Sequence, residues 1–206
     1  ERWYWHADRM GVVVMQDAVQ KYGHANASTI PFFEHDLVAM IEGRGNHPCI
    51  VQWETFNEGD CWAVFDAAGP PHSVSDTVAL ARRTDWQGRL VDTDSGGGAN
   101  DQPEGDVNDI HSYPDPGDPT PKGNKYAMIG EFGGIGAFVA GKEWVPGKCH
   151  TYEKVDTPQD EADTYVKMAA KILGQIGHLS ASVYTQITDV ELECDGFLNY
   201  DRSTKF

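Results

Sequence analysis

Short apolar runs alternate with amphipathic stretches along the chain. Residues 12–15, 49–53 and 126–129 are almost entirely apolar and have the length of a strand. Runs of this kind are typical of strands buried on both faces, as in parallel sheets. Weaker strand signals lie at 89–92, 107–111 and 182–186. The pattern therefore predicts six strands.

Helical periodicity separates these strands. Helices are predicted at 1–10, 31–43, 74–83 and 158–176, and Trp3 and Met10 are expected to pack inward in the first. The second shows an apolar stripe formed by Phe33, Leu37, Met40 and Ile41.

The helix at 158–176 has the clearest boundaries. Thr157 can cap it, Pro158 suits its first position, and Asp160 and Glu161 favour its positive N-terminus. Gly177 is expected to end it. Strands and helices in alternation predict an α/β fold with a parallel sheet. Because 206 residues fit one domain and no linker is visible, residues 1–206 are taken as one unit.

Polar residues lie at the carboxyl ends of the predicted strands. In barrel enzymes, the active site is formed at these ends of the parallel strands. These residues are Asp17, Asn57, Glu58, Asp109, His111, Tyr113, Glu131, Gln186 and Asp189. Glu58 and Glu131 stand out because each directly follows a strand.

Charge narrows the choice of partners. The formal net charge of -16 argues against nucleic acid and against an anionic membrane surface. No apolar run approaches the roughly 18 residues that a membrane-spanning helix needs. A neutral substrate such as a sugar is compatible with this surface. The compartment and the oligomeric state stay open.

The four cysteines, Cys49, Cys61, Cys149 and Cys194, have no spacing typical of a zinc site. Isolated buried thiols are the favoured interpretation. The alternative is one disulfide that includes Cys149.

A pair of carboxyl groups can hydrolyse a glycoside with retention of configuration. One group must be protonated to donate to the leaving oxygen, and the other must be ionised to attack the anomeric carbon. By strand count, Glu58 and Glu131 would face each other across the mouth of an eight-stranded barrel. The alternative is that both are ordinary surface glutamates.

Several segments resemble the catalytic barrel of glycoside hydrolase family 2. Asn46–Trp53 with Phe56-Asn57-Glu58-Gly59 resembles the strand that delivers Asn-Glu, and Ile129–Gly134 resembles the nucleophile strand. Tyr184-Thr185-Gln186 with Thr188–Glu191 resembles the last strand. The resemblance implies an α/β fold that is a partial (β/α)8 TIM barrel, roughly strands 3 to 8. The first two strands and the family's β-sandwich domains are expected to be missing from residues 1–206.

The resemblance also implies a retaining β-glycoside hydrolase that needs no metal or other cofactor. Glu58 would be the acid/base and Glu131 the nucleophile. Asn57 would hydrogen-bond the sugar 2-hydroxyl, and Tyr113 would lie near the nucleophile. Residues expected in the pocket wall are Asp17, His111, Trp144 and Gln186. The carbohydrate substrate is expected to be a neutral sugar, with β-galactoside favoured.

A metal site, a calcium-binding loop and a phosphate-binding loop each have weaker support in the sequence. Asp109 and His111 could bind a metal, but the remaining histidines lack a paired spacing; they include His24, His35, His47 and His72. Asp92-Thr93-Asp94 begins like a calcium loop without the closing glutamate, so a turn is expected there. Gly96-Gly97-Gly98 lacks the lysine of a phosphate loop.

The rival from another class is a non-catalytic carbohydrate-binding or inactive barrel fragment. It would use aromatic side chains that are expected to be exposed at the barrel mouth. These are Trp53, Trp62, Tyr113 and Trp144.

Overall fold

The computed structural model describes residues 2–19, 26–59, 62–97 and 103–206. They form two compact units. The first contains Glu1–Asp109 with Gly123–Lys125, and the second contains Ile110–Lys122 with Tyr126–Phe206. The α/β prediction with parallel strands is confirmed in both units. The finer prediction, strands 3 to 8 of a (β/α)8 barrel, stays a prediction.

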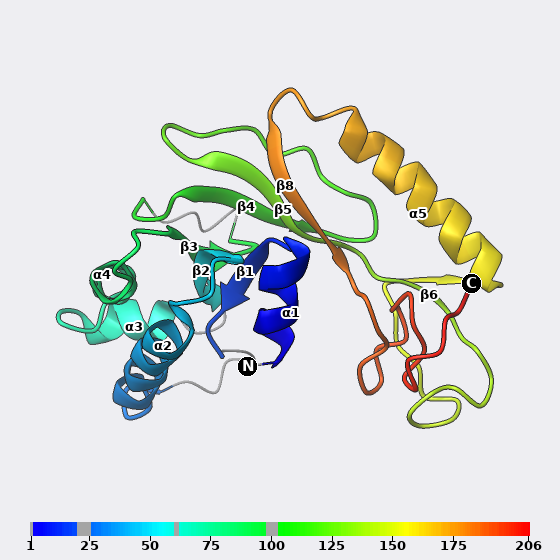
Figure 1. Ribbon diagram of the computed structural model, residues 1–206, viewed down its shortest axis with the longest axis horizontal. Coiled ribbons are helices and arrows are strands. Elements are labelled where there is room, and N and C mark those ends of the chain that lie inside the picture. The colour runs from blue at the N-terminus through cyan, green and yellow to red at the C-terminus, as the bar shows by residue number, and fades with distance from the viewer. Residues whose placement is uncertain (1, 20–25, 60–61, 98–102) are drawn as a thin grey trace. The chain divides into compact units, whose positions relative to one another are not determined.

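A three-stranded parallel sheet of order β1-β2-β3 forms the centre of the first unit. Its helices α2, α3 and α4 gather beside this sheet (Figure 1). In chain order the elements are α1 (Arg2–Met10), β1 (Val14–Asp17), α2 (Ile30–Arg44), β2 (Ile50–Asn57), α3 (Trp62–Ala68), α4 (Val74–Thr84) and β3 (Leu90–Ser95).

Strand β2 lies in the middle of this sheet, and most of its side chains are buried, on both faces, as its apolar run predicts. Ile50 and Phe56 belong to the core, and Trp53 is 0% exposed. The expectation that Trp53 is an exposed sugar-binding aromatic is therefore wrong, because the ring packs with Leu37, Ile41 and other core side chains.

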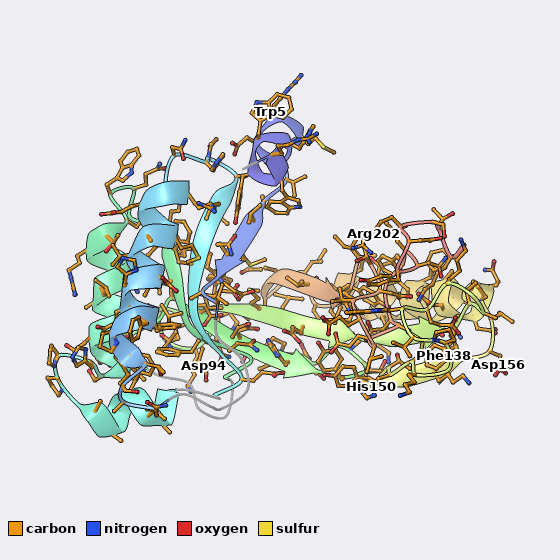
Figure 2. The ribbon with its side chains drawn as sticks, turned by 90° about the horizontal axis from the view of Figure 1, so that it is seen from below. Trp5, Asp94, Phe138, His150, Asp156 and Arg202 are labelled. Carbon is orange, nitrogen blue, oxygen red and sulfur yellow. A yellow bond between two sulfur atoms is a disulfide. The ribbon has the colours of Figure 1, made fainter. Side chains whose placement is uncertain are left out.

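The start of the chain packs differently from the prediction. Helix α1 forms, but Trp3 is 59% exposed and Met10 is 74% exposed, and Ala7 is the buried residue. Trp5 projects outward from the helix (Figure 2). The apolar run enters β1 only at Val14, since Val12 and Val13 are exposed.

Two small sheets build the second unit. Strand β4 (Val107–Ser112) runs into it from the first unit and joins a sheet of order β4-β5-β8, with β5 (Tyr126–Gly133) and β8 (Leu179–Thr185) parallel. Strands β6 (Ile135–Ala137) and β7 (Glu153–Val155) pair in parallel beside α5 (Pro158–Leu173). Elements α3, β6 and β7 carry no pattern that predicts them from the sequence.

Helix α5 begins as predicted. The Thr157 side chain accepts from the Asp160 backbone N–H, and the Asp160 carboxylate accepts from Thr157 in return. The helix ends at Leu173 with Gly174 as its C-cap, three residues before the predicted Gly177. Met168 faces the core of this unit, with Ile129, Phe132 and Ile135.

No described helix combines the length and the apolar character that crossing a membrane requires.

Candidate functional site

The predicted site residues fall into two sets. Asp17, Asn57 and Glu58 belong to the first unit, and His111, Tyr113, Glu131, Trp144 and Gln186 belong to the second. Each set is therefore described within its own unit.

Glu131 lies near the end of β5 with two of the predicted residues beside it. The Tyr113 hydroxyl donates a hydrogen bond to the Glu131 carboxylate, and the His111 Nδ1 lies 3.5 Å from the same oxygen. Thr185, the last residue of β8, places its Oγ1 2.7 Å from the Tyr113 hydroxyl. The ends of β5 and β8 and the segment after β4 thus converge on one carboxylate.

Tyr113 is held as a hydrogen-bond donor. Burial first, and then the hydrogen bond to the Glu131 carboxylate, raises the pKa of Tyr113 far above its usual range. The phenol therefore keeps its proton, and that proton is directed at Glu131 or shared with Thr185. A neutral donor beside a carboxylate steers one oxygen lone pair and leaves the other oxygen available for a ligand.

Tyr152, like Thr185, belongs to this site although the sequence did not single it out. Its ring stacks on Tyr113 with centroids 3.7 Å apart and an interplanar angle of 6°. It comes directly before β7 and packs over Gly134, where an added Cβ would overlap the Tyr152 ring. No local signal marks Tyr152, because its partners lie elsewhere in the chain.

Trp144 and Gln186 make their contacts elsewhere in the second unit. Trp144 stacks on Tyr200, with ring centroids 5.2 Å apart. The Gln186 amide donates to Asp195 at 2.7 Å and to Glu193 at 3.2 Å. Their predicted place in the pocket wall thus stays a prediction.

Glu58 occupies a turn of unusual backbone conformation. It follows the end of β2 with φ 54°, in the left-handed region that non-glycine residues rarely adopt. Its N–H donates to the Ser95 carbonyl at 2.8 Å, and the Gly59 N–H donates to Asp94 Oδ1 at 3.0 Å. The end of β3 therefore fixes this turn. Backbone outliers of this kind concentrate at functional sites.

The other predicted residues of the first unit lie on neighbouring strand ends. Asn57 is the last residue of β2 and is paired in register with Ser95. Asp17 ends β1, is exposed, and is paired with Glu54. The first unit thus presents Asp17, Asn57 and Glu58 from two adjacent strands, as expected for parallel strands.

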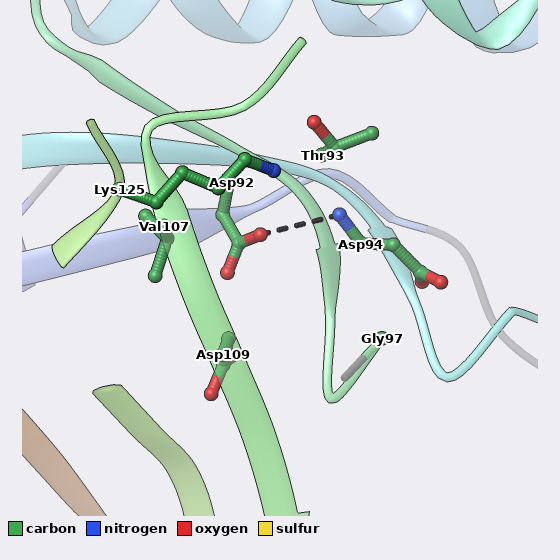
Figure 3. Close-up of a pocket in the computed structure, with 7 residues that line it drawn as sticks. All are labelled: Asp92, Thr93, Asp94, Gly97, Val107, Asp109 and Lys125. Atoms are coloured by element: carbon green, nitrogen blue, oxygen red, sulfur yellow. Dashed lines mark hydrogen bonds between the residues drawn. The ribbon is translucent and has the colours of Figure 1, made fainter. Parts of the chain in front are cut away.

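Buried acids lie in the sheet next to the Glu58 turn. Asp92, Asp94 and Asp109 line a small pocket with Lys125, and the Asp92 carboxylate extends toward Asp109 (Figure 3). Asp109 accepts hydrogen bonds from the Ser95 hydroxyl at 3.1 Å and the Gly96 N–H at 3.2 Å. Asp109 thereby holds the same Ser95 whose carbonyl receives the Glu58 N–H.

Two buried acids of this sheet, Asp92 and Glu54, have raised pKa values. Burial, followed by the neighbouring Asp109 carboxylate, raises the pKa of Asp92 well above its usual range. Burial and the hydrogen bond to Asp17 raise the pKa of Glu54 in the same direction. The turn predicted at Asp92-Thr93-Asp94 is wrong, because all three residues belong to β3. Within this strand, Asp92 Oδ1 accepts a hydrogen bond from the Asp94 N–H at 3.2 Å.

Three of the histidines considered as metal ligands pair separately with carboxylates. His35 contacts Asp36 at 3.2 Å, His47 contacts Asp8 at 2.7 Å, and His72 contacts Glu34 at 2.9 Å. His24 lies outside the described residues, as does Gly98 of the glycine-rich segment. In the described chain, these three pairs do not share a ligand.

The cysteine interpretation requires correction. Cys149 and Cys194 form a disulfide across 45 residues, so they are not isolated thiols. Cys49 is free and buried, and burial, with the hydrogen bond to Asp8, raises the pKa of its thiol to about 11. Cys61 lies outside the described residues.

Comparisons with known proteins find solved structures with a similar fold but no similar sequence family. No family model and no curated protein matches the chain. A Faecalibacterium prausnitzii β-glucuronidase matches with TM-score 0.61 and 17% identity, over 100% of this chain and 39% of that chain.

Two further β-glucuronidase structures match at similar levels. One, from Ruminococcus gnavus in complex with N1-substituted uronic isofagomine, has TM-score 0.64 and 19% identity, over 100% of this chain and 39% of that chain. Bacteroides uniformis β-glucuronidase 2, covalently bound to cyclophellitol-6-carboxylate aziridine, has TM-score 0.65 and 12% identity, over 98% and 28% of the two chains. Residues 1–206 thus have the fold found in part of these β-glucuronidases and span less than half of their length.

Proposed function

We propose that this chain carries the catalytic pair of a retaining β-glycoside hydrolase, with Glu131 as the nucleophile and Glu58 as the acid/base. The observation that carries the proposal is the setting of Glu131. Its carboxylate lies near the end of β5, with a protonated phenol from Tyr113 and an imidazole from His111 directed at one oxygen. Such an arrangement orients a carboxylate for attack.

The reaction is a double displacement. A Glu131 oxygen attacks the anomeric carbon, the glycosidic C–O bond breaks, and Glu58 gives its proton to the departing oxygen. A glycosyl ester on Glu131 results. Glu58 then takes a proton from water, the resulting hydroxide oxygen displaces Glu131, and the sugar leaves with its original anomeric configuration.

Glu58 suits the second role because its turn is fixed and its side chain is exposed. The backbone contacts to Ser95 and Asp94 hold the turn. An acid/base must exchange a proton with water between the two steps, and an exposed side chain permits that exchange. Asn57, next to it, is proposed to bind the sugar 2-hydroxyl, and Asp17, Trp144 and Gln186 are proposed for the pocket wall.

The fold of the matched β-glucuronidases supports a β-glycoside as the substrate class. One of those proteins is described as covalently bound to an aziridine of cyclophellitol, which is consistent with a nucleophile in this fold. The sequence favours a neutral sugar, most of all a β-galactoside. The matched structures bring β-glucuronides into consideration as well, so the sugar is decided by assay.

A second candidate is a non-catalytic carbohydrate-binding protein. The observation in its favour is Trp144, which is 46% exposed and stacks on Tyr200. Exposed aromatic rings of this kind can bind the face of a sugar. Sugar binding without hydrolysis would support this candidate.

The deciding experiment is hydrolysis of a panel of aryl β-glycosides by the full-length protein and by its Glu131→Gln variant. The panel includes β-galactoside, β-glucuronide, β-glucoside and β-mannoside. We expect one member to be cleaved with retention and the variant to lose several orders of magnitude in kcat. Activity that survives Glu131→Gln would contradict the assignment of the nucleophile.

A further inference from the structure

Tyr152 covers the face of Tyr113 without being a core residue. The two rings stack almost parallel, yet Tyr152 is 51% exposed. A half-exposed ring contributes less to stability than a buried one, since much of its apolar surface stays in water. The close stack therefore needs another explanation, and its partner Tyr113 is the residue that donates to Glu131.

The segment that carries Tyr152 is anchored on both sides. The Gly134 carbonyl accepts from the Tyr152 N–H at 2.9 Å, from the Glu153 N–H at 3.1 Å, and from the Thr151 hydroxyl. Just before it, the Cys149–Cys194 disulfide and two backbone hydrogen bonds of His150, to Leu192 and Cys194, attach the segment to residues 192–194. The Tyr152 ring is thus mounted on backbone with little freedom.

Gly134 makes room for that ring. It has φ 61°, and an added Cβ would overlap the Tyr152 ring. Since Gly134 also supplies the anchoring carbonyl, the segment after Glu131 both holds Tyr152 and leaves space for it. The same stretch of chain therefore connects Glu131, Tyr152 and, through the stack, Tyr113.

We propose that Tyr152 is a positioning residue: its anchored ring holds Tyr113 in the orientation from which the Tyr113 hydroxyl donates to Glu131. A tyrosine hydroxyl lies at the far end of a ring that turns about two side-chain torsions, so a small tilt moves it off its partner. Tyr152 restricts that tilt from one face. The catalytic consequence rests on the proposed function, because it requires Glu131 to be the nucleophile.

A double-mutant cycle in the full-length protein tests this role. Tyr152→Ala removes the ring, and Tyr113→Phe removes the hydroxyl that the ring is proposed to hold. We expect each to lower kcat/KM by up to roughly 10²-fold, and the double variant to lose little more than Tyr113→Phe alone. Tyr152→Phe, the matched control, keeps the ring and should rescue activity. Losses that multiply in the double variant would overturn the proposal, because a purely structural role would act independently of Tyr113.

A spectroscopic measurement separates this proposal from the proposed function. In protein labelled with [ζ-13C]tyrosine, the Tyr113 signal is assigned by its disappearance in Tyr113→Phe. The hydrogen on the Tyr113 hydroxyl, which is bonded to Glu131 in the folded protein, should exchange with water faster in Tyr152→Ala than in the wild type and Tyr152→Phe. The exchange rate is read at near-neutral pH from the deuterium isotope shift of the Tyr113 Cζ signal. An unchanged exchange rate would overturn the inference even in an active enzyme. Faster exchange in a protein without hydrolase activity would sustain the positioning of Tyr113 and reject the proposed function.

Discussion

The ends of β2 and β5 each present a glutamate, but they hold it by different means. At β2, Glu58 is set by its own backbone, a left-handed turn whose N–H groups bond to β3. At β5, Glu131 is set by side chains, with Tyr113 and His111 on its carboxylate and Tyr152 behind Tyr113. The first arrangement fixes the backbone position from which the Glu58 side chain extends. The second fixes the position of the Glu131 carboxylate itself.

This difference agrees with the roles proposed for the two residues. A nucleophile must approach one carbon atom along one line, so its oxygen needs fixed neighbours. An acid/base exchanges its proton with solvent and with two different oxygen atoms during one turnover. A fixed turn with an exposed side chain meets that need.

The largest expected effect comes from removing the two carboxylates in turn and supplying azide. Glu58→Ala should lower kcat by roughly 10²–10⁴-fold, while a dinitrophenyl glycoside still forms the ester on Glu131. Azide then displaces Glu131, and the product is the β-glycosyl azide. In Glu131→Ala, azide attacks the substrate directly and gives the α-glycosyl azide. Proton NMR of the products distinguishes the two, and identical anomers would contradict the assigned roles.

Removal of the disulfide should destabilise the second unit. Cys149→Ala with Cys194→Ala releases a closure across 45 residues, for which the loss in the free energy of unfolding is about 4 kcal/mol. Urea unfolding measures the loss. Cys49→Ala, which removes a buried thiol without a covalent partner, is the control. Equal stabilities of the double variant and the wild type would contradict the structural role of the disulfide.

The stability of the second unit should also fall as the pH rises. Burial raises the pKa of Glu161 from 4.5 to about 7, so the folded state binds the proton more tightly than the unfolded state does. The stabilisation is complete below about pH 4.5 and is lost as the pH passes 7, a change of up to roughly 3 kcal/mol. Glu161→Gln should flatten that part of the profile in urea unfolding. Asp163→Asn, an exposed acid on the same helix, controls for net charge.

The smallest effect concerns Gly134. Gly134→Ala places a Cβ against the Tyr152 ring, whereas Gly141→Ala, also at positive φ, meets nothing within 4 Å. Both variants strain the backbone by roughly 1 kcal/mol, and Gly134→Ala should cost about 1–2 kcal/mol more. Thermal unfolding compares them. Equal losses would indicate that the Tyr152 ring moves aside freely.

Local signals predicted much of this fold. The cap residues Thr157 and Asp160 mark the start of α5, and the apolar stripe of α2 marks its buried face, because helix signals act over one or two turns. The strands that deliver Glu58 and Glu131 were predictable because a short apolar run is also a local signal. The end of α5 was misplaced because Gly174 and Gly177 are both acceptable stop signals.

The remaining features depend on contacts distant in the sequence. Strands β6 and β7 have three residues each, which is too short for any periodicity. Tyr152 acquires its role from Tyr113 and Gly134, and Cys149 pairs with Cys194, one of three candidate partners. Trp3 and Met10 were assigned to the wrong face because a short helix with many apolar residues fits several registers.

The chemical reactivity of the Lys205 amine reports local unfolding of the second unit. Its side chain is fully buried, with Nζ 2.9 Å from Asp189 and 3.0 Å from the Cys194 carbonyl. An amine-reactive label therefore cannot reach Lys205 while these contacts hold, although it reaches half-exposed amines such as that of Lys171 at once. The rate at which Lys205 is labelled is measured by mass spectrometry of its peptide. This rate would report the frequency of local unfolding around Lys205.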